Sequence, residues 1–323
     1  MVERNGRVEQ RQGDPSEHLV AVTIDIEDWY HGPSVTGAPY GAFEDVSAFF
    51  AKWNDRYDYL SEPTRDILDL LSQFDIRATF FVVADVLENY PGLVESIVSK
   101  GHEIACHGLH HACKIDPTTK QPLLTPHEFM ERTRHAKQAL ESVSGRTVLG
   151  YRAPSAFVAG WMLDCLEDLG FQYDSSLCAN SLFNKTDSQL KGVGTAPYYP
   201  ARNSLEPGPS REILEMPMPH LRAILKFPAS GGPFLRFFGA RYILMALRQA
   251  RRRGDTLFYF HPIDICNEPF PGGFTKKRPL YWAAKGARTR RQIGKILTQR
   301  DLRFCTCQEM LDRAHARLEE GSP

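Results

Sequence analysis

Acidic side chains gather at one place near the start of the chain. Asp25, Glu27 and Asp28 lie within four residues, directly after an apolar segment. Burying like charges together is costly unless a cation binds them or a pKa rises. We therefore interpret the cluster as a metal ligand beside a general base. An exposed acidic loop is the alternative, since most acidic residues lie at the surface.

A second cluster consists of histidines. His107 and His111 are four residues apart, a spacing that places both imidazoles on one side of a helical turn, where they can bind one ion. A carboxylate from another strand end would complete a set with positions open to water, which is typical of catalytic metal sites. Histidines that are hydrogen-bonded within a loop are the alternative.

Arg152 and His261 also follow apolar segments directly. Arg152 comes after residues 147–151 and is suited to orient a carboxylate through paired hydrogen bonds. His261 ends the apolar run 256–260, and its ordinary pKa of about 6.5 suits a general acid. Taken alone, each has a plainer interpretation: a surface salt bridge for Arg152 and a hydrogen-bonded core histidine for His261.

The segments before these residues predict the strands of a parallel sheet. Strand-like and helix-like patterns alternate at least six times, which requires parallel strands with right-handed crossovers, in an α/β barrel or a doubly wound sheet. The expected strands are 19–24, 78–83, 103–106, 147–151, 171–173, 213–216 and 256–260, and the expected helices include 87–100, 126–144, 158–169 and 241–253, with a helix, a strand and a helix in 286–318. Because the carboxyl ends of parallel strands share one face, the four clusters are expected to meet there.

Length and composition exclude several classes of protein. The chain has 323 residues, of which 42% are hydrophobic, and this is ordinary for a globular domain. Lys+Arg and Asp+Glu both number 39, so no excess of positive charge supports nucleic-acid binding. No apolar run approaches the ~20 residues of a membrane span. No glycine-rich nucleotide motif follows a strand, so no nucleotide cofactor is expected.

Cysteine usage and the first residues bear on the compartment. Seven cysteines, an odd number, argue against a disulfide framework and favour packed, reduced thiols. A reducing cytoplasm is therefore the expected location. Residues 1–17 are polar, lack the apolar core of a secretory signal and are expected to be a disordered lead.

Five motifs together resemble the polysaccharide deacetylase family, carbohydrate esterase family 4. They are T-I-D-I-E-D-W at 23–29, R-A-T-F-F-V at 77–82, H-E-I-A-C-H-G-L-H-H at 102–111, Y-R-A-P-S at 151–155 and F-Y-F-H-P at 258–262. The D-x-E-D-W form is similar to a subgroup associated with bacterial exopolysaccharide and lipopolysaccharide biosynthesis. The stretch that begins at Glu215 also resembles that subgroup's C-terminal extension.

The resemblance implies a fold and a set of site residues. The fold would be a single-domain, distorted (β/α)7-type barrel over residues 18–265, with a C-terminal extension at 266–323 packed on it. One divalent metal, with zinc as the first expectation, would be held by an aspartate and two histidines. Carried onto this chain, Asp25 is the general base, His107 and His111 are metal ligands, Arg152 orients the base and His261 is the general acid. Asp28 is favoured as the third ligand for its shorter side chain, and Glu27 is the alternative.

The implied activity is removal of acetyl groups from N-acetylated sugars of a bacterial polysaccharide or its precursor. This is hydrolysis of a carbon–nitrogen bond outside a peptide, and the partner is a carbohydrate. Trp29, Tyr30 and the loop 178–210 are expected to form a platform for the sugar, because aromatic faces pack on apolar sugar faces. The alternatives are an allantoinase-like amide or imide hydrolase of the same fold and an inactive relative that binds glycan. The oligomeric state is left open.

Overall fold

The structure is a computed structural model that describes residues 17–31, 58–111, 116, 118–119, 123–179, 190, 193–208, 211–229, 231–268 and 283–320. The expected disordered lead at 1–17 falls, apart from Glu17, outside the described residues. Within these ranges, no helix has the length and apolar character that a membrane crossing requires.

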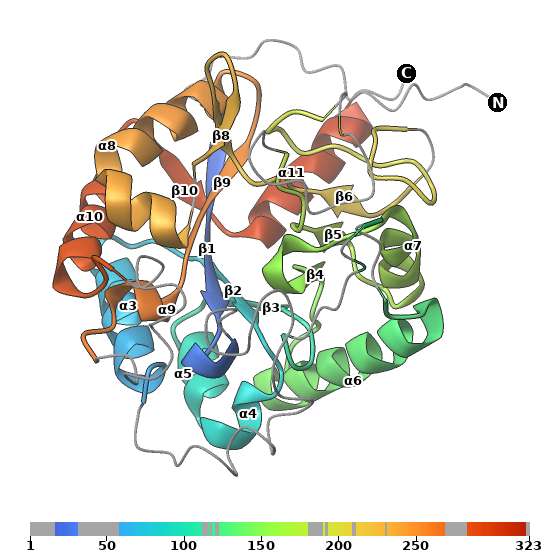
Figure 1. Ribbon diagram of the computed structural model, residues 1–323, viewed down its shortest axis with the longest axis horizontal. Coiled ribbons are helices and arrows are strands. Elements are labelled where there is room, and N and C mark those ends of the chain that lie inside the picture. Colours follow the sequence, from blue (N-terminus) through green and yellow to red (C-terminus); the bar gives the residue numbers. More distant parts are fainter. Residues whose placement is uncertain are drawn as a thin grey trace.

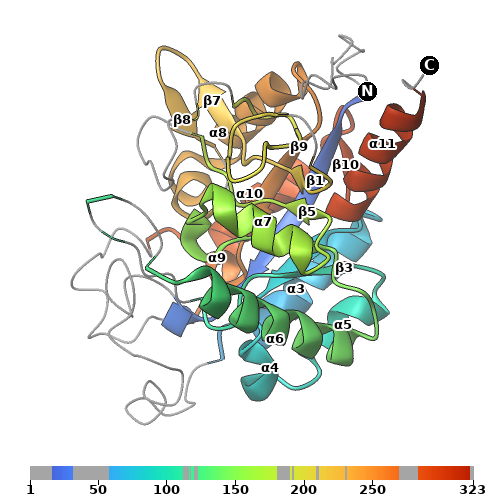
Figure 2. The ribbon, with the colours of Figure 1, turned by 90° about the vertical axis from the view of Figure 1, so that its right-hand side faces the viewer.

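Eight parallel strands form one curved sheet (Figure 1). They are β1 Leu19–Ile26, β2 Thr79–Val82, β3 Glu103–Cys106, β4 Gly150–Tyr151, β5 Tyr173–Asp174, β6 Leu214–Glu215, β9 Thr256–Phe260 and β10 Arg303–Cys305. The order from β1 runs through β2, β3, β4 and β5 to β6, while β9 and β10 also pair with β1. With helices along its outside (Figure 2), the sheet makes a half-barrel, which confirms the expected fold class.

The helices follow the expected order, and two of the expected helices differ in their bounds. They are α3 Ser61–Gln73, α4 Val86–Asn89, α5 Leu93–Ser99, α6 Pro126–Ser144, α7 Gly160–Asp168, α8 Gly232–Arg251, α9 Pro262–Ile265, α10 Ala287–Leu297 and α11 Cys307–Glu320. The single helix expected over 87–100 is two, because the chain turns at Tyr90–Gly92 and Gly92 has a φ of 86°. α8 begins nine residues before the expected start at 241 and breaks at Gly239, whose φ is 71°. Helix α6 has its expected bounds and begins with a capping box between Thr125 and Glu128.

Alternation along the central strand separates two cores. The even-numbered residues of β1 from Val20 to Ile26 join the cluster between the sheet and its helices. Ala21 belongs to a second cluster on the inner face of the curved sheet. Because successive side chains on a strand point to opposite faces, Asp25 shares the inner face with Ala21. This alternation sends the acidic side chain into the half-barrel and away from the helices.

The C-terminal part of the chain contributes to the same sheet. β10 pairs with β1 at residues 19–21. In α11, Met310 and Leu311 pack in the inner cluster with Ala21, so this helix occupies the inner face near the amino end of β1. The proposed boundary between a barrel at 18–265 and an extension at 266–323 stays a prediction. An antiparallel hairpin that sequence patterns did not predict, β7 His220–Arg222 and β8 Lys226–Pro228, precedes α8.

Candidate active site

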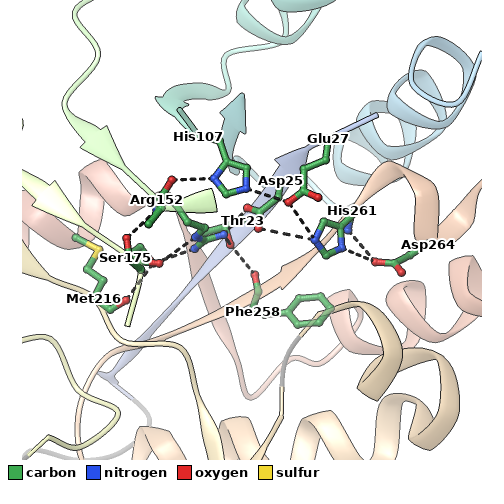
Figure 3. Close-up of polar contacts among 12 residues, drawn as sticks. Thr23, Asp25, Glu27, His107, Arg152, Ser175, Met216, Phe258, His261 and Asp264 are labelled. Carbon is green, nitrogen blue, oxygen red and sulfur yellow. Dashed lines mark hydrogen bonds and ion pairs between the residues drawn. The ribbon is translucent and has the colours of Figure 1, made fainter. Parts of the chain in front are cut away.

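The register of the sheet brings the expected site residues to one level. Ile26 is paired with Val82, Val82 with Cys106 and Cys106 with Tyr151. The residues that follow these positions therefore lie along one rim, at the carboxyl ends of the strands. Glu27, His107 and Arg152 are such residues. On the other side of β1, Ile24 is paired with Phe260, which places His261 beside Asp25 (Figure 3).

Glu27 and the two expected histidines converge. The Oε1 atom of Glu27 lies 2.9 Å from Nε2 of His107 and 3.0 Å from Nε2 of His111. One ligand atom from each residue lies within 4.8 Å of the others. Burial alone would raise the pKa of the Glu27 carboxyl, but His111, His107 and His261 hold it well below its usual value. Glu27 is thus an anion facing two imidazoles.

The ring nitrogens of the histidines fit a metal ion. Nδ1 of His107 lies 2.8 Å from the backbone oxygen of Arg152, and because a carbonyl only accepts, Nδ1 carries the hydrogen. The Nε2 atom of His107 is then the ring nitrogen that faces Glu27 and is the one available to a metal ion. Nε2 of His111 is buried and makes no hydrogen bond, although Glu27 is near. Burial, together with repulsion from His107 and His31, lowers the pKa of His111 despite Glu27, which favours the neutral form that binds metals.

Asp28 does not lie with the histidines, contrary to the preference stated above. Its Oδ2 accepts a hydrogen bond of 2.5 Å from the Tyr90 hydroxyl, and its Oδ1 accepts one of 2.6 Å from the backbone N–H of Trp29. Burial raises the pKa of Asp28 to about 6. The chain turns directly after β1, where the backbone N–H of Glu27 donates to the oxygen of Asp25 at 3.1 Å, and Glu27 faces the histidines while Asp28 faces Tyr90. The described geometry therefore places Glu27, the alternative ligand, with the two histidines.

Asp25 is held by Arg152. The guanidinium Nη1 of Arg152 donates to Oδ1 of Asp25 at 2.5 Å and to Oγ1 of Thr23 at 3.0 Å. Its Nε and Nη2 donate to the backbone oxygen and the hydroxyl of Ser175. Arg152 is fully buried, and its guanidinium carbon is 3.9 Å from the centre of the Phe81 ring. Arg152 thus contacts Asp25 through one nitrogen and not through a bidentate pair, and its orienting role stays a prediction.

His261 faces both carboxylates and is oriented from behind. Its Nε2 lies 3.9 Å from Oδ2 of Asp25 and 3.8 Å from Oε1 of Glu27. Its Nδ1 lies 2.9 Å from Oδ2 of Asp264, and Asp264 is in turn paired with Nε of Arg236 at 3.1 Å. Burial would lower the pKa of His261, but its bond to Asp264 and the three carboxylates raise it to about 9.

The segment between the two histidines is a bend and not the expected helical turn. Gly108 has a φ of 80°, and a Cβ there would meet the Pro154 ring at 2.9 Å. His111 itself has a φ of 51°. Both features are characteristic of a chain that is folded sharply to return His111 toward Glu27. The two imidazoles still meet, with ring centres 4.9 Å apart.

Two other expectations meet different outcomes. Trp29 and Tyr30 are each 3% exposed, so they are packed side chains and do not present faces for a sugar. The expected loop 178–210 lies partly outside the described residues. Sequence patterns did not reveal three residues that position the site. Asp264 contacts His261, Arg236 contacts Asp264, and Ser175 contacts Arg152. Asp264 could have been found from the sequence, since it is the third residue of a helical turn that begins at Pro262, the position from which a side chain reaches back to the residue before the helix.

Two family models match the chain. Residues 34–173 match the polysaccharide deacetylase model, and residues 185–312 match a domain of unknown function (DUF3473). The first match includes His107, His111 and Arg152. Asp25, Glu27 and His261 lie outside it, so their assignment depends on the geometry described above.

Relatives agree with the first match. A chitooligosaccharide deacetylase from Bradyrhizobium sp. (strain ANU 289) is 32% identical over 127 residues, which is 39% of this chain and 53% of that protein. The chain thus spans about half the length of this curated relative.

Solved structures share the fold. A crystal structure from Mycobacterium smegmatis, of a protein assigned to the polysaccharide deacetylases, superimposes with a TM-score of 0.57 and 22% identity over 96% of this chain and 94% of that one. The structure of Puue allantoinase has the same fold, with a TM-score of 0.55 and 17% identity over 92% of this chain and 90% of that one. The match over residues 34–173 identifies a polysaccharide deacetylase domain in this chain.

Proposed function

We propose that the protein is a metal-dependent deacetylase that hydrolyses the acetamido group of N-acetylated sugars in a bacterial polysaccharide or its precursor. One observation carries the proposal most directly. Asp25 and His261 stand next to each other beside the set of Glu27, His107 and His111. Amide hydrolysis needs a base for the attacking water and an acid for the departing amine, and these two residues offer both.

A divalent metal fits the donor set of Glu27, His107 and His111. Two imidazoles and one carboxylate suit zinc, and three protein ligands are the number found in catalytic zinc sites. When bound, the ion supplies Lewis acidity, which makes water a stronger acid and an amide carbonyl more electrophilic. Imidazole and carboxylate ligands also bind iron, cobalt and manganese. We propose zinc because the number and types of these ligands are those of catalytic zinc sites.

The protein's own residues divide the proton transfers. Asp25 takes a proton from the attacking water, and Arg152, with its nitrogen 2.5 Å away, holds that carboxylate in place. After the hydroxide adds to the acetyl carbon, the nitrogen must leave as an amine. The Nε2 atom of His261 donates the proton that this nitrogen needs. Asp264 holds the opposite nitrogen of the ring and stabilises its charged form. The products are acetate and an amino sugar.

The test is acetate release from chitooligosaccharides by the zinc-loaded chain. The wild type should release acetate, whereas Asp25→Asn and His261→Asn should each lose about 100-fold or more in kcat, the usual contribution of general acid–base catalysis. Thr195→Val, a substitution outside the described site, is the control. Equal turnover in Asp25→Asn and wild type would contradict the proposal.

The same assay addresses the alternatives. A small cyclic amide offered beside the oligosaccharide would be hydrolysed preferentially by an allantoinase-like enzyme. Bound zinc and bound oligosaccharide without any acetate would indicate a binding protein. The cytoplasmic location stays a prediction, supported by the buried free thiols Cys106, Cys165, Cys266, Cys305 and Cys307.

A further inference from the structure

Charge is distributed very unevenly along this neutral chain. From Met216 to Gly254 there is no aspartate or glutamate, while the same stretch contains eight lysine or arginine residues. This stretch forms the β7–β8 hairpin and helix α8. Some of its arginines are committed to the fold: Arg236 pairs with Asp264 and Arg248 pairs with Asp301. Others, such as Arg222, Arg241 and Arg252, are exposed.

The tip of the hairpin is apolar and projects into solvent. Ile224 is 100% exposed, and its neighbour Leu225 is also exposed. The backbone N–H of Ala223 donates to the oxygen of Leu225 at 3.0 Å, which fixes the turn. Leaving these side chains in water forgoes the stabilisation that burial gives to apolar groups. The hairpin is therefore built to present an apolar tip.

Both ends of the hairpin are fastened to α8. Gln249 accepts a hydrogen bond from the backbone N–H of Arg222 at 2.7 Å and donates one to its oxygen at 2.9 Å. The Tyr242 hydroxyl donates to the oxygen of Pro228 at 2.8 Å. Figures 1 and 2 both show the hairpin beside α8 at the edge of the molecule. The hairpin and α8 thus form one rigid unit.

Helix α8 adds apolar side chains next to these attachment points. The ring of Phe238, 60% exposed, lies 5.0 Å from that of Tyr242. Met245, 52% exposed, is one helical turn before Gln249 and therefore on the same face. Arg241 is one turn before Met245, so a cation flanks the apolar side chains. We call the exposed residues Arg222, Ile224, Leu225, Phe238, Arg241, Met245 and Arg252 the basic-apolar surface.

We propose that the basic-apolar surface attaches the protein to the surface of an anionic lipid bilayer. Aliphatic and aromatic side chains enter the boundary between headgroups and acyl chains, while nearby arginines contact the anionic headgroups. A fully exposed tip at the end of a hairpin projects outward, which suits insertion into a layer of lipid. The lack of acidic residues in the whole stretch removes the repulsion that anionic lipid would otherwise exert. The binding does not depend on the proposed deacetylase activity.

The test is sedimentation of the full chain with sucrose-loaded vesicles. We compare vesicles of phosphatidylcholine that contain about 30% of the anionic lipid phosphatidylglycerol with vesicles of phosphatidylcholine alone. We expect binding to the anionic vesicles at least about tenfold tighter, and weaker in high salt. Ile224→Ser/Leu225→Ser and Arg222→Gln/Arg241→Gln/Arg252→Gln should each reduce binding by about tenfold or more.

Matched controls change the same chemistry elsewhere. Leu123→Ser alters an apolar side chain that is 60% exposed, and Arg65→Gln/Arg132→Gln/Arg134→Gln removes three exposed charges from α3 and α6. Both should bind vesicles like the wild type. All altered side chains are at the surface, and thermal unfolding verifies that each variant is folded.

Three outcomes would overturn the proposal. One is a wild type that does not sediment with anionic vesicles. Another is an equal loss of binding in the surface and control arginine variants, which would mean that net charge alone acts. The third is a wild type that is a dimer and does not bind vesicles, together with an Ile224→Ser/Leu225→Ser variant that is a monomer. This result would mean that the surface contacts a second copy of the chain.

Discussion

His107 donates its Nδ1 hydrogen to the backbone oxygen of Arg152, and the side chain of Arg152 donates to Asp25. One residue therefore orients a proposed metal ligand through its main chain and the proposed base through its side chain. A substitution of Arg152 changes the second link and leaves the first intact.

Because of this arrangement, an Arg152 substitution should lower activity without lowering zinc binding. Arg152→Lys keeps the positive charge, so the Asp25 carboxylate stays paired, but it loses the fork that also reaches Ser175 and Thr23. We expect kcat for acetate release to fall by about 100-fold, the size of a mispositioned base. Zinc content should stay at the wild-type level. Loss of zinc and activity together would show that the side chain also supports the metal ligands.

The two acidic residues that follow the central strand, Glu27 and Asp28, should respond differently to neutralisation. Glu27→Gln removes a carboxylate facing two imidazoles, and we expect zinc affinity to fall by more than about 100-fold, beyond the usual effect of residues outside the ligand shell. Asp28→Asn should change it by less than about threefold, since this side chain bonds to Tyr90 and Trp29. Competition with a chelating dye measures both affinities. A larger loss in Asp28→Asn would restore that residue as the ligand.

The contrast between Glu27 and Asp28 also shows how far the sequence reaches. Parallel strands end on one side of a sheet. The positions of Asp25, His107, Arg152 and His261 at the ends of predicted strands were therefore enough to predict that they lie along one rim. Alternating strands and helices predicted a parallel sheet, either a barrel or a doubly wound sheet, and the resemblance to the deacetylase family favoured the barrel. Glu27 and Asp28 both lie after the end of β1, in a turn in which the backbone N–H of Glu27 donates to the oxygen of Asp25, and their different directions depend on this turn and on contacts with distant residues.

Other features depend on contacts between distant segments and had no local signal. The bend at Gly108 is set by the Pro154 ring packing against it, which no spacing of histidines encodes. Arg236 reaches Asp264 from α8, and this helix begins well before its amphipathic pattern. Trp29 and Tyr30 are buried against the rest of the fold, whereas their position in a loop suggested exposure. Tertiary packing decides each of these cases.

The raised pKa of His261 predicts a pH dependence of stability in the metal-free protein. Asp264 and the nearby carboxylates raise this pKa from 6.5 to about 9 in the folded chain. The folded state therefore binds the proton more tightly than the unfolded state. The resulting stabilisation is complete below about pH 6.5 and is lost as the pH rises to about 9. We expect the free energy of unfolding, measured in urea, to fall by on the order of 3 kcal/mol over this range.

His261→Asn is the control for this measurement, because the variant lacks the titrating ring. Its free energy of unfolding should change much less between pH 6.5 and 9 than that of the wild type. Zinc must be removed first, since a bound cation near Glu27 opposes protonation of the ring. Identical slopes in the two proteins would assign the pH dependence to another group.

A buried pair of acids beneath the site predicts a second pH dependence. Asp174 and Glu215 are paired across β5 and β6 and are fully buried. Burial, and for Glu215 also the neighbouring Asp174, raises the pKa of both carboxyls, that of Glu215 well above its usual value. A proton shared between them relieves the repulsion. Stability from this proton is complete below about pH 4.5, the ordinary value for Glu215, and declines as the pH rises toward its folded pKa.

Glu215→Gln tests this sharing because an amide keeps a donor for Asp174 without titrating. We expect the wild type to lose up to about 1.4 kcal/mol of stability per pH unit wherever this proton is released. The variant should show a shallower decline between pH 5 and 6.5, a range below that in which His261 contributes. The measurement is urea unfolding of both proteins across this range. Parallel curves would mean that Glu215 is ionised in the folded protein. Its charge would then be compensated by Arg152, the cation that lowers the pKa of both carboxyls.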